Sequence, residues 1–416
     1  MNDTSGNPDV RVAIVADDLS GAADSAVAFT QLGRVLLGLS PDLEQSGAAE
    51  VVCLDADTRH ARAREAETRT CRCIERVLAS HPSFVFKKVD STLRGHVGIE
   101  TAAALGRVAR DAGDGRAVAL IAPAFPAMGR TTSAGCQRKD GDALAGAAGD
   151  IAGLLHGAGL HSGLLDLDSV RGGSVLGLAE RMDRAVTEGT DALVCDALVD
   201  ADLDRIVAAA GALDHPLLYV GSAGLAHALA RALGGAEAHP SVPAAVPGGV
   251  PLLVLAGSRT QTTRAQVRAL GEEPGVFVTG IEPVDLLHAR AEVFDRLGHW
   301  EAHLRAGRDL VLHIDEVDCA ADTAVELVEA LAELVIPLAS AAGSVLATGG
   351  DMARSMLARL QVPWLLVRGE LEPGVVLSRA ERAPVGNVVT KAGGFGHPET
   401  LVRVRRWLHT QGAPAR

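Results

Sequence analysis

Aromatic residues, lysine and long apolar runs are all scarce in this chain of 416 residues. Aromatic residues make up only 3 %, so alanine, valine, leucine and glycine must fill the interior, which suits closely packed α/β layers. The formal net charge of -13 argues against general affinity for nucleic acid, because phosphate backbones require clustered cations. No apolar run approaches the roughly 20 residues that cross a bilayer. We therefore expect neither a nucleic acid nor a membrane as partner.

Several familiar signal and catalytic patterns are also missing. The N-terminal segment is polar without a basic-then-apolar signal pattern, and the six cysteines show no C-x-x-C spacing, so we expect a cytoplasmic protein with reduced thiols. The Walker pattern G-x-x-x-x-G-K-[ST] and a G-x-G-x-x-G fingerprint after a strand are absent, as is a G-x-S-x-G motif. The histidines form no H-E-x-x-H or comparable cluster, so no bound structural metal is expected.

The pattern of apolar segments predicts an α/β protein with two domains. Short β-rich apolar runs alternate with segments of helical period, which is typical of mainly parallel sheets flanked by helices. A chain of this length is expected to form two cores rather than one. The Gly- and Pro-rich segment 236–250 predicts a linker between a domain at 1–235 and a second domain at 251–416. Segment 131–150 has no clear period and is expected to be a long surface loop.

The most informative segment is 86–98, FKKVDSTLRGHVG, at the end of a predicted strand. Only four lysines occur in the chain, and two of them, Lys87 and Lys88, stand here side by side. Ligands of open α/β sheets bind outside the carboxyl ends of the strands, so these side chains predict a site for a small anionic molecule. Arg94 has the planar fork that suits a carboxylate, and Gly95 allows the backbone to approach a ligand closely.

The first strand-to-helix junction, VADDLSGAADSA at 15–26, is a second candidate site. Helix N-termini offer unpaired N–H groups that favour anions or polar substrate atoms. Asp17 and Asp18 could bind a sugar hydroxyl there or deprotonate one as a general base. The alternative is that Asp18 or Ser20 only caps the helix.

Three glycine-rich turns in the second half each follow a predicted strand: AGSRT at 256–260, ATGGDM at 347–352 and KAGGFG at 391–396. Strand-to-helix turns with exposed N–H groups cradle phosphates. Each turn alone is ordinary, but three in one domain predict a nucleotide site. Because no lysine follows a glycine, backbone amides must make most of the phosphate contacts there. By contrast, Ser222 in YVGSAGL is expected to cap a helix.

In this order the motifs resemble those of the four-carbon acid sugar kinase family, which contains D-threonate, D-erythronate and 3-oxo-tetronate kinases. The matching strings are VADDLSGAADSA, FKKVDSTLRGHVGIE, APAFPAMGRTT, VGSAGLA, LAGSRT, ATGGDMA, GELEPGV and KAGGFG. They run from residue 15 to residue 396, which is almost the whole chain. The string KKVDSTLRG is the most specific of them.

The resemblance implies a kinase of carbohydrate metabolism that uses ATP and Mg²⁺ to phosphorylate a terminal hydroxyl of a four-carbon sugar acid. It implies an acid-sugar-binding domain followed by a nucleotide-binding domain, with a small sugar acid as partner; a homodimer is compatible with it. The implied acid contacts are Asp17, Asp18, Lys88, Asp90, Ser91, Arg94 and Gly95, of which Asp17, Asp18, Lys88 and Asp90 are the candidate catalytic residues. The implied nucleotide contacts are Ser258, Gly349, Gly350, Asp351, Met352, Gly393 and Gly394. Either Asp17 or Asp18 would orient or deprotonate the attacking hydroxyl, and Arg94 with Lys88 would hold the substrate carboxylate.

The sequence departs from the family pattern in three places. An apolar, proline-containing stretch is usual after Arg130–Thr132, where this chain reads SAGCQRKDGDALAG. Met352 stands where a threonine is usual, and Ala392 and Gly394 stand where serine and asparagine are common. These changes keep the backbone amides and remove polar side chains. They keep open a non-catalytic sugar-acid-binding or regulatory relative as an alternative. A second, less favoured alternative is an NAD-dependent hydroxy-acid oxidoreductase, another two-domain α/β enzyme, against which the missing dinucleotide fingerprint counts.

Overall fold

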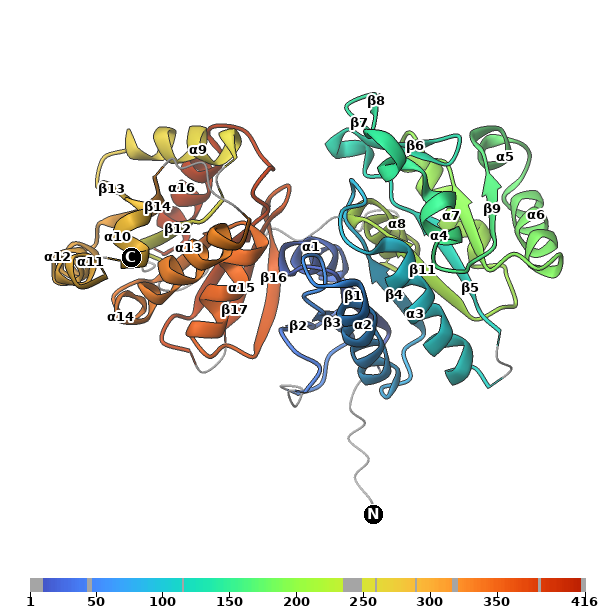
Figure 1. Cartoon of the computed structure of the whole chain (residues 1–416), viewed down its shortest axis with the longest axis horizontal. Helices are drawn as coiled ribbons and strands as arrows, with labels where there is room; N and C mark the ends of the chain where they lie inside the picture. Colours follow the sequence, from blue (N-terminus) through green and yellow to red (C-terminus); the bar gives the residue numbers. More distant parts are fainter. Residues whose placement is uncertain are drawn as a thin grey trace, which may run out of the picture. The chain divides into compact units, whose positions relative to one another are not determined.

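The computed structural model describes residues 10–42, 47–113, 116–234, 249–258, 260–288, 290–315, 321–380 and 383–412. The chain divides into two compact units, Met1–Pro240 and Ser241–Arg416 (Figure 1). Most of the predicted linker 236–250 lies outside the described residues. Among the described residues, none of the helices combines the length and the apolar character that crossing a membrane requires.

The first unit is built on a parallel sheet whose strands are β1 (Val12–Ala16), β2 (Val35–Gly38), β3 (Val51–Asp55), β4 (Phe84–Lys88), β5 (Val118–Ala122), β9 (Ser162–Leu165), β10 (Ala192–Cys195) and β11 (Leu217–Gly221). Their order across the sheet is β2-β3-β1-β4-β11-β5-β10-β9. Central strands such as β1 and β5 are apolar and buried throughout, as expected for parallel strands covered on both faces.

Helices cover both faces of this sheet. They are α1 (Leu19–Ala26), α2 (Ala63–Leu78), α3 (Val97–Asp111), α4 (Ile151–His156), α5 (Leu167–Arg171), α6 (Val175–Thr187), α7 (Asp200–Ala210) and α8 (Ala223–Gly234), with 3-10 turns η1 (Val27–Phe29), η2 (Pro126–Met128) and η3 (Gly146–Gly149). Helices α2, α3 and α4 pack in one group, and α1, α7 and α8 pack in another (Figure 1). Because crossovers between parallel strands are right-handed, the two groups lie on opposite faces of the sheet.

The prediction of a long surface loop at 131–150 is wrong. This segment contains a small antiparallel sheet of β6 (Arg130–Ser133), β7 (Cys136–Lys139) and β8 (Asp142–Ala143). Its anchor is the fully buried Gln137, whose Nε2 donates to Ser91 O at 2.7 Å and to Pro123 O at 3.2 Å. Because the buried side chain is an amide, the segment shows no apolar period from which a strand could be predicted.

The second unit holds the strands β12 (Leu252–Ala256), β13 (Val276–Ile281), β14 (Asp309–Ile314), β15 (Ser344–Thr348), β16 (Trp364–Glu372), β17 (Val375–Ala380) and β18 (Asn387–Lys391). Their order is β13-β14-β12-β15-β18-β17-β16, and β17 runs antiparallel to both of its neighbours.

The string GELEPG lies at the hairpin between β16 and β17, where Glu370 accepts a hydrogen bond from Gly374 N at 2.9 Å. The predicted fold class, α/β with mainly parallel sheets flanked by helices, is confirmed.

The helices of the second unit are α9 (Gln261–Gly271), α10 (Pro283–His288), α11 (Arg290–Asp295), α12 (Leu297–Arg305), α13 (Ala321–Glu333), α14 (Val335–Ala339), α15 (Gly350–Arg359) and α16 (Thr400–Gly412). Helices α9 and α16 pack together over an apolar core that includes Leu252, Leu346 and Leu401. Strands β12, β15 and β18 are parallel neighbours, so their carboxyl ends lie side by side. The three glycine-rich turns therefore meet at one edge of the sheet.

Candidate active site

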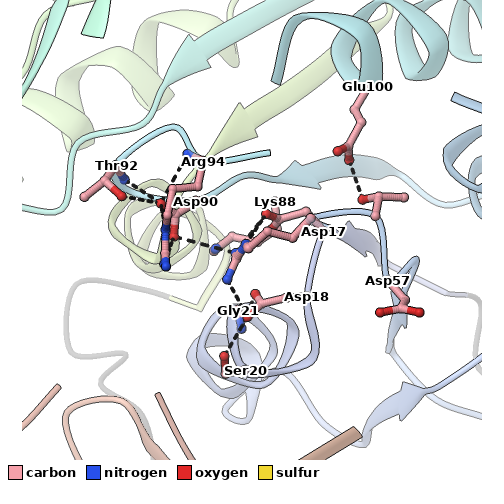
Figure 2. A network of polar contacts seen from close by, with 12 residues as sticks. Asp17, Asp18, Ser20, Gly21, Asp57, Lys88, Asp90, Thr92, Arg94 and Glu100 are labelled. Carbon is pink, nitrogen blue, oxygen red and sulfur yellow. Dashed lines mark hydrogen bonds and ion pairs between the residues drawn. The ribbon is translucent and has the colours of Figure 1, made fainter. Parts of the chain in front are cut away.

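Polar side chains from three neighbouring strand ends form a cluster in the first unit (Figure 2). Strand β1 lies between β3 and β4, and Ala16 is in register with both Asp55 and Lys88. We call the group that follows these strands the strand-end cluster; its members are Asp17, Asp18, Arg59, Lys88, Asp90 and Arg94. Three carboxylates and three cations thus share the carboxyl edge of a parallel sheet, which is where such sheets bind ligands.

Asp18 is the N-cap of α1. Its Oδ1 accepts from Gly21 N at 2.9 Å, and its Oδ2 accepts from Ser20 Oγ at 2.7 Å. A Cβ at Gly21 would stand 2.6 Å from Asp18 Oδ1 and 2.7 Å from Lys88 Nζ, so a larger residue here would displace both side chains. Arg59 and Lys88, together with these hydrogen bonds, lower the pKa of Asp18 in spite of its burial. Asp18 therefore stays ionised and fixed in place.

Arg59 is the residue that joins the strand-end cluster, and the sequence interpretation missed it. Its Nε and Nη2 each lie 2.8 Å from Asp17 Oδ2, while Nη1 lies 2.6 Å from Asp18 Oδ2 and Nη2 lies 3.6 Å from Asp90 Oδ1. Only 11 % of its side chain is exposed. The signal was available, because Arg59 follows the end of predicted strand 51–54 as Asp17 and Asp90 follow theirs.

Asp17 is the carboxylate of the cluster with an unused oxygen. Its Oδ2 is paired with Arg59, but its Oδ1 is buried and has no hydrogen-bond partner within the part of the chain that the structure describes. Burial raises the pKa of Asp17, with a smaller contribution in the same direction from the Asp18 carboxylate and opposition from Arg59. A buried polar atom without a partner marks a place where a ligand group is expected.

Asp90 holds the loop after β4 in shape. Its Oδ2 accepts from Thr92 N at 3.0 Å and from Arg94 Nε at 3.0 Å, and its Oδ1 accepts from Arg94 Nη2 at 2.7 Å (Figure 2). Burial by itself would raise the pKa of Asp90, but these hydrogen bonds and the charge of Arg59 hold that pKa far below its usual range. Ser91 and Gly95 lie in the same loop, with Gly95 at a φ of 87° that favours glycine. Arg94 keeps 65 % of its side chain exposed.

The two neighbouring lysines have different surroundings, because successive side chains of a strand point to opposite faces. Lys87 is fully buried and pairs with Glu100 of α3, with Nζ 2.8 Å from Oε2, which also accepts from Thr58 Oγ1 at 2.9 Å. Lys88 is also buried, and its Nζ makes no hydrogen bond or ion pair with any described residue. The structure therefore places Lys88 beside Asp18 in the cluster and Lys87 in the core.

In the second unit the three glycine-rich turns touch one another. Gly349 N donates to Lys391 O at 2.8 Å, and Thr260 Oγ1 donates to Gly393 O at 3.0 Å. A Cβ at Gly393 would stand 2.4 Å from Ser258 Oγ, so glycine permits the contact between the first and third turns. Gly349 has a φ of 94° directly before α15. The turns thus form one surface of backbone amides at helix N-termini, which suits phosphate.

Two predicted nucleotide contacts in α15 differ in exposure. Met352 is 1 % exposed, and its side chain packs where a Cβ of Gly257 would stand, so it forms core. Asp351 is exposed in the first turn of the helix, next to Gly350. Beside Ser258 and Thr263 lies a cavity of about 390 Å³, with an apolar wall that includes Ala256, Val267, Val278 and Ile314 and a polar rim of Arg264, Arg268, His313 and Asp315.

Within the described ranges, no group of three or more His, Cys, Asp or Glu side chains lies close enough together to hold a metal ion.

Ser222 caps helix α8 as expected: its Oγ accepts from Gly224 N at 3.3 Å and donates to Ala124 O at 2.9 Å. The functional chemistry in the described residues is thus concentrated at the strand-end cluster and at the three turns.

Two family models match the chain: a sugar-binding N-terminal domain at residues 12–229 and a nucleotide-binding C-terminal domain at residues 253–401. Curated relatives share the whole length. A D-threonate kinase of Cupriavidus necator is 37 % identical and the match covers 97 % of this chain and 99 % of the relative. A D-threonate kinase of Bordetella bronchiseptica is 32 % identical over 94 % and 96 %, and a 3-oxo-tetronate kinase of Methylobacterium radiotolerans is 30 % identical over 92 % and 95 %.

A crystal structure of a protein from Salmonella typhimurium LT2 has the same fold, with a TM-score of 0.78 over 96 % of this chain and 99 % of that one, at 22 % identity. The domain pair and the full-length relatives define a two-domain kinase. The chain belongs to the four-carbon acid sugar kinase family, as its motifs predicted.

Proposed function

We propose that this kinase transfers the γ-phosphoryl group of ATP to a terminal hydroxyl of a four-carbon sugar acid. The domain at 1–235 binds the acid and the domain at 251–416 binds the nucleotide. D-threonate is the first acid to test, because two relatives with that activity in their names are 37 % and 32 % identical to this chain. The observation that carries the proposal is the strand-end cluster, in which the unpartnered Asp17 oxygen and the buried Lys88 ammonium lie at one sheet edge.

The cluster divides the work of binding the acid. Lys88 and the exposed part of Arg94 supply positive charge for the substrate carboxylate. Asp90 orients Arg94 and is fully engaged in doing so. Ser91 and Gly95 belong to the same loop, and Gly95 allows its positive φ. Arg59 binds no substrate in this scheme and instead bridges Asp17 and Asp18, offsetting the repulsion between the two carboxylates.

Asp17 is the proposed general base, and Asp18 is the positioning carboxylate. Asp17 has a free buried oxygen and a raised pKa, so it can accept the proton of the attacking hydroxyl. Asp18 has both oxygens engaged and a lowered pKa, which makes it a poor proton acceptor. Phosphoryl transfer needs mainly positioning and charge stabilisation, so one such base suffices without a covalent nucleophile.

The residues of the second unit fit a nucleoside triphosphate. Backbone amides of the turns at Ser258, Gly349–Gly350 and Gly393–Gly394 suit the phosphates, and the adjoining cavity of about 390 Å³ suits the nucleoside. Mg²⁺ is usually held by phosphates, water and one or two carboxylates rather than by a protein cage, so exposed Asp351 is the residue that would meet it. The ion would neutralise charge on the phosphates when bound.

The deciding experiment is a coupled assay of ADP release with Mg-ATP over a panel of C4 aldonic and oxo acids. D-threonate, D-erythronate and 3-oxo-tetronate are the test acids, and ATP without acid is the control. We expect acid-dependent ADP release with at least one of them. If no acid raises ADP release above the control while NAD turnover or simple acid binding is seen, the proposed function is wrong.

A further inference from the structure

Lys391 is a buried cation at the edge where the three turns meet. It is the last residue of β18, and only 1 % of its surface is exposed. Its Nζ donates to Ala392 O at 2.9 Å and to Gly393 O at 3.3 Å, and it has no carboxylate partner within the described residues. Burying an ammonium without an anion is costly, and burial accordingly lowers the pKa of Lys391 to about 8.

The hydrogen bonds of Lys391 are not needed to satisfy the two carbonyl oxygens. Ala392 O also accepts from Phe395 N at 3.1 Å. Gly393 O also accepts from Thr260 Oγ1 and from Thr263 Oγ1, each at 3.0 Å. A neutral side chain at this position would leave neither oxygen without a donor. Burying the ammonium of Lys391 therefore costs free energy in the ligand-free protein, and its hydrogen bonds to these two oxygens do not explain why a cation stands here.

The same contacts set the direction of the turn's N–H groups. In a trans peptide the N–H points opposite to the carbonyl. Because Lys391 and the two threonines hold Gly393 O, the N–H of Gly394 points away from them. Neither Gly393 N nor Gly394 N donates to an acceptor among the described residues, and a Cβ at Gly394 would meet nothing within 4 Å. Gly394 is exposed and Gly393 is half-buried against Ser258, so the two N–H groups without acceptors lie at the surface of the turn.

We propose that Lys391 is the positioning residue of the phosphate-binding turn: its ammonium holds the carbonyls of Ala392 and Gly393 inward, so that the N–H groups of Gly393 and Gly394 face the polyphosphate, whose negative charge compensates the buried cation. This inference rests on the proposed function, in which ATP is the phosphoryl donor. Lys391 acts through the peptide groups and through charge, and its contribution grows with the number of phosphates on the ligand.

The test is calorimetric titration of the full chain with ATP, ADP and adenosine. Lys391→Met should weaken ATP and ADP binding about tenfold to hundredfold and leave adenosine binding within about twofold. Lys139→Met, which removes an exposed lysine of β7, is the matched control and should change none of the three affinities. An equal loss for adenosine and ATP would show a merely structural role, and retained ATP affinity would remove the role altogether.

Lys391→Gln provides a second variant should Lys391→Met fail to fold, because glutamine keeps an N–H donor without the charge. The Lys391→Gln variant should also lose affinity for the three ligands in proportion to the number of phosphates that each carries. A loss of affinity that is the same for ATP, ADP and adenosine overturns the inference. The wild-type titration separates the two claims. If wild-type protein binds neither ATP nor ADP, the proposed function and this inference both fail; if it binds them and both variants bind equally well, only the role of Lys391 fails.

Discussion

At the scale of single residues, the neighbours Lys87 and Lys88 have different roles: Lys87 stabilises the fold, and Lys88 is proposed to bind the acid. Lys87 neutralises buried Glu100, so Lys87→Met should cost about 3–5 kcal/mol of unfolding free energy by leaving a buried charge without its partner. Lys88 forms no ion pair this close, although its charge lowers the pKa of Asp18, so Lys88→Met should change Tm less than Lys87→Met does and raise the KM for the acid about tenfold or more. Thermal unfolding and steady-state kinetics of the two variants check this. The reverse pattern would place Lys87 rather than Lys88 in the site.

Asp17→Asn tests the assignment of the base. Asparagine keeps the size of the side chain and cannot accept the proton, so kcat should fall about 10²- to 10⁴-fold with a smaller change in KM. Asp18→Asn is the matched variant: asparagine still caps α1 but loses the charge that pairs with Arg59, so Tm should fall with a smaller loss of kcat. Equal losses of kcat in both variants would show that the two carboxylates act as one unit.

Lys391 also makes the stability of the free protein depend on pH. Burial lowers its pKa from 10.5 to about 8 in the folded chain, so the native state binds fewer protons than the unfolded state between these values. Stability of the wild type therefore rises with pH across this window, and below pH 8 the buried charge costs roughly 3 kcal/mol at most.

The Lys391→Met variant has no buried charge at this position and so avoids its free-energy cost. The Tm of the variant without ligand should exceed that of the wild type at pH 7, and the difference should shrink at pH 9. Thermal unfolding at the two pH values measures it. A variant that is less stable at pH 7 by an amount that does not change with pH would mean that the hydrogen bonds of Lys391, and not its burial, dominate.

Which residues stand at strand ends could be predicted from the sequence, and which of them touch could not. Asp17, Lys88 and Asp90 were each noticed because they stand at the end of an apolar strand, and the family resemblance assigned them to one acid site. Arg59 escaped notice because no unusual string surrounds it, and its role appears only once β3 is placed beside β1. The choice between Asp17 and Asp18 as base likewise depends on which oxygens have partners, and sequence spacing carries no such information.

At the scale of elements, strands that depend on tertiary contacts could not be predicted from the sequence, whereas apolar strands could. Strands β1 and β5 are buried on both faces and read as continuous apolar runs. Strand β7 is CQRK, and it was missed because its inward residue, Gln137, is polar and bonds to loop carbonyls. A strand held by such bonds needs its tertiary partners before it can be recognised.

The contact between the first and third glycine-rich turns gives a prediction for an element rather than a side chain. A Cβ at Gly393 would stand 2.4 Å from Ser258 Oγ and 2.9 Å from Ser258 Cβ, so Gly393→Ala must push the two turns apart. We expect a rise in the KM for ATP of about tenfold or more, with the KM for the acid little changed. Gly106→Ala, at a helical site with nothing within 4 Å, is the control and should leave both values unchanged. Unaltered KM for ATP in Gly393→Ala would remove the third turn from the nucleotide site.

At the scale of the whole molecule, the two family models match separate stretches, so each unit should bind its ligand with its own residues. A ligand at 100 times its Kd stabilises a protein by about 2.7 kcal/mol, which a thermal shift resolves. In the full chain, Lys88→Met should reduce the shift produced by D-threonate by about half or more and keep that produced by ADP, while Gly393→Ala should do the opposite. Because the two substitutions lie in different units of the chain, the double variant should show both reductions and no further interaction. A single substitution that removed both shifts would mean that acid and nucleotide depend on one shared set of residues, which contradicts the division of labour proposed for the two domains.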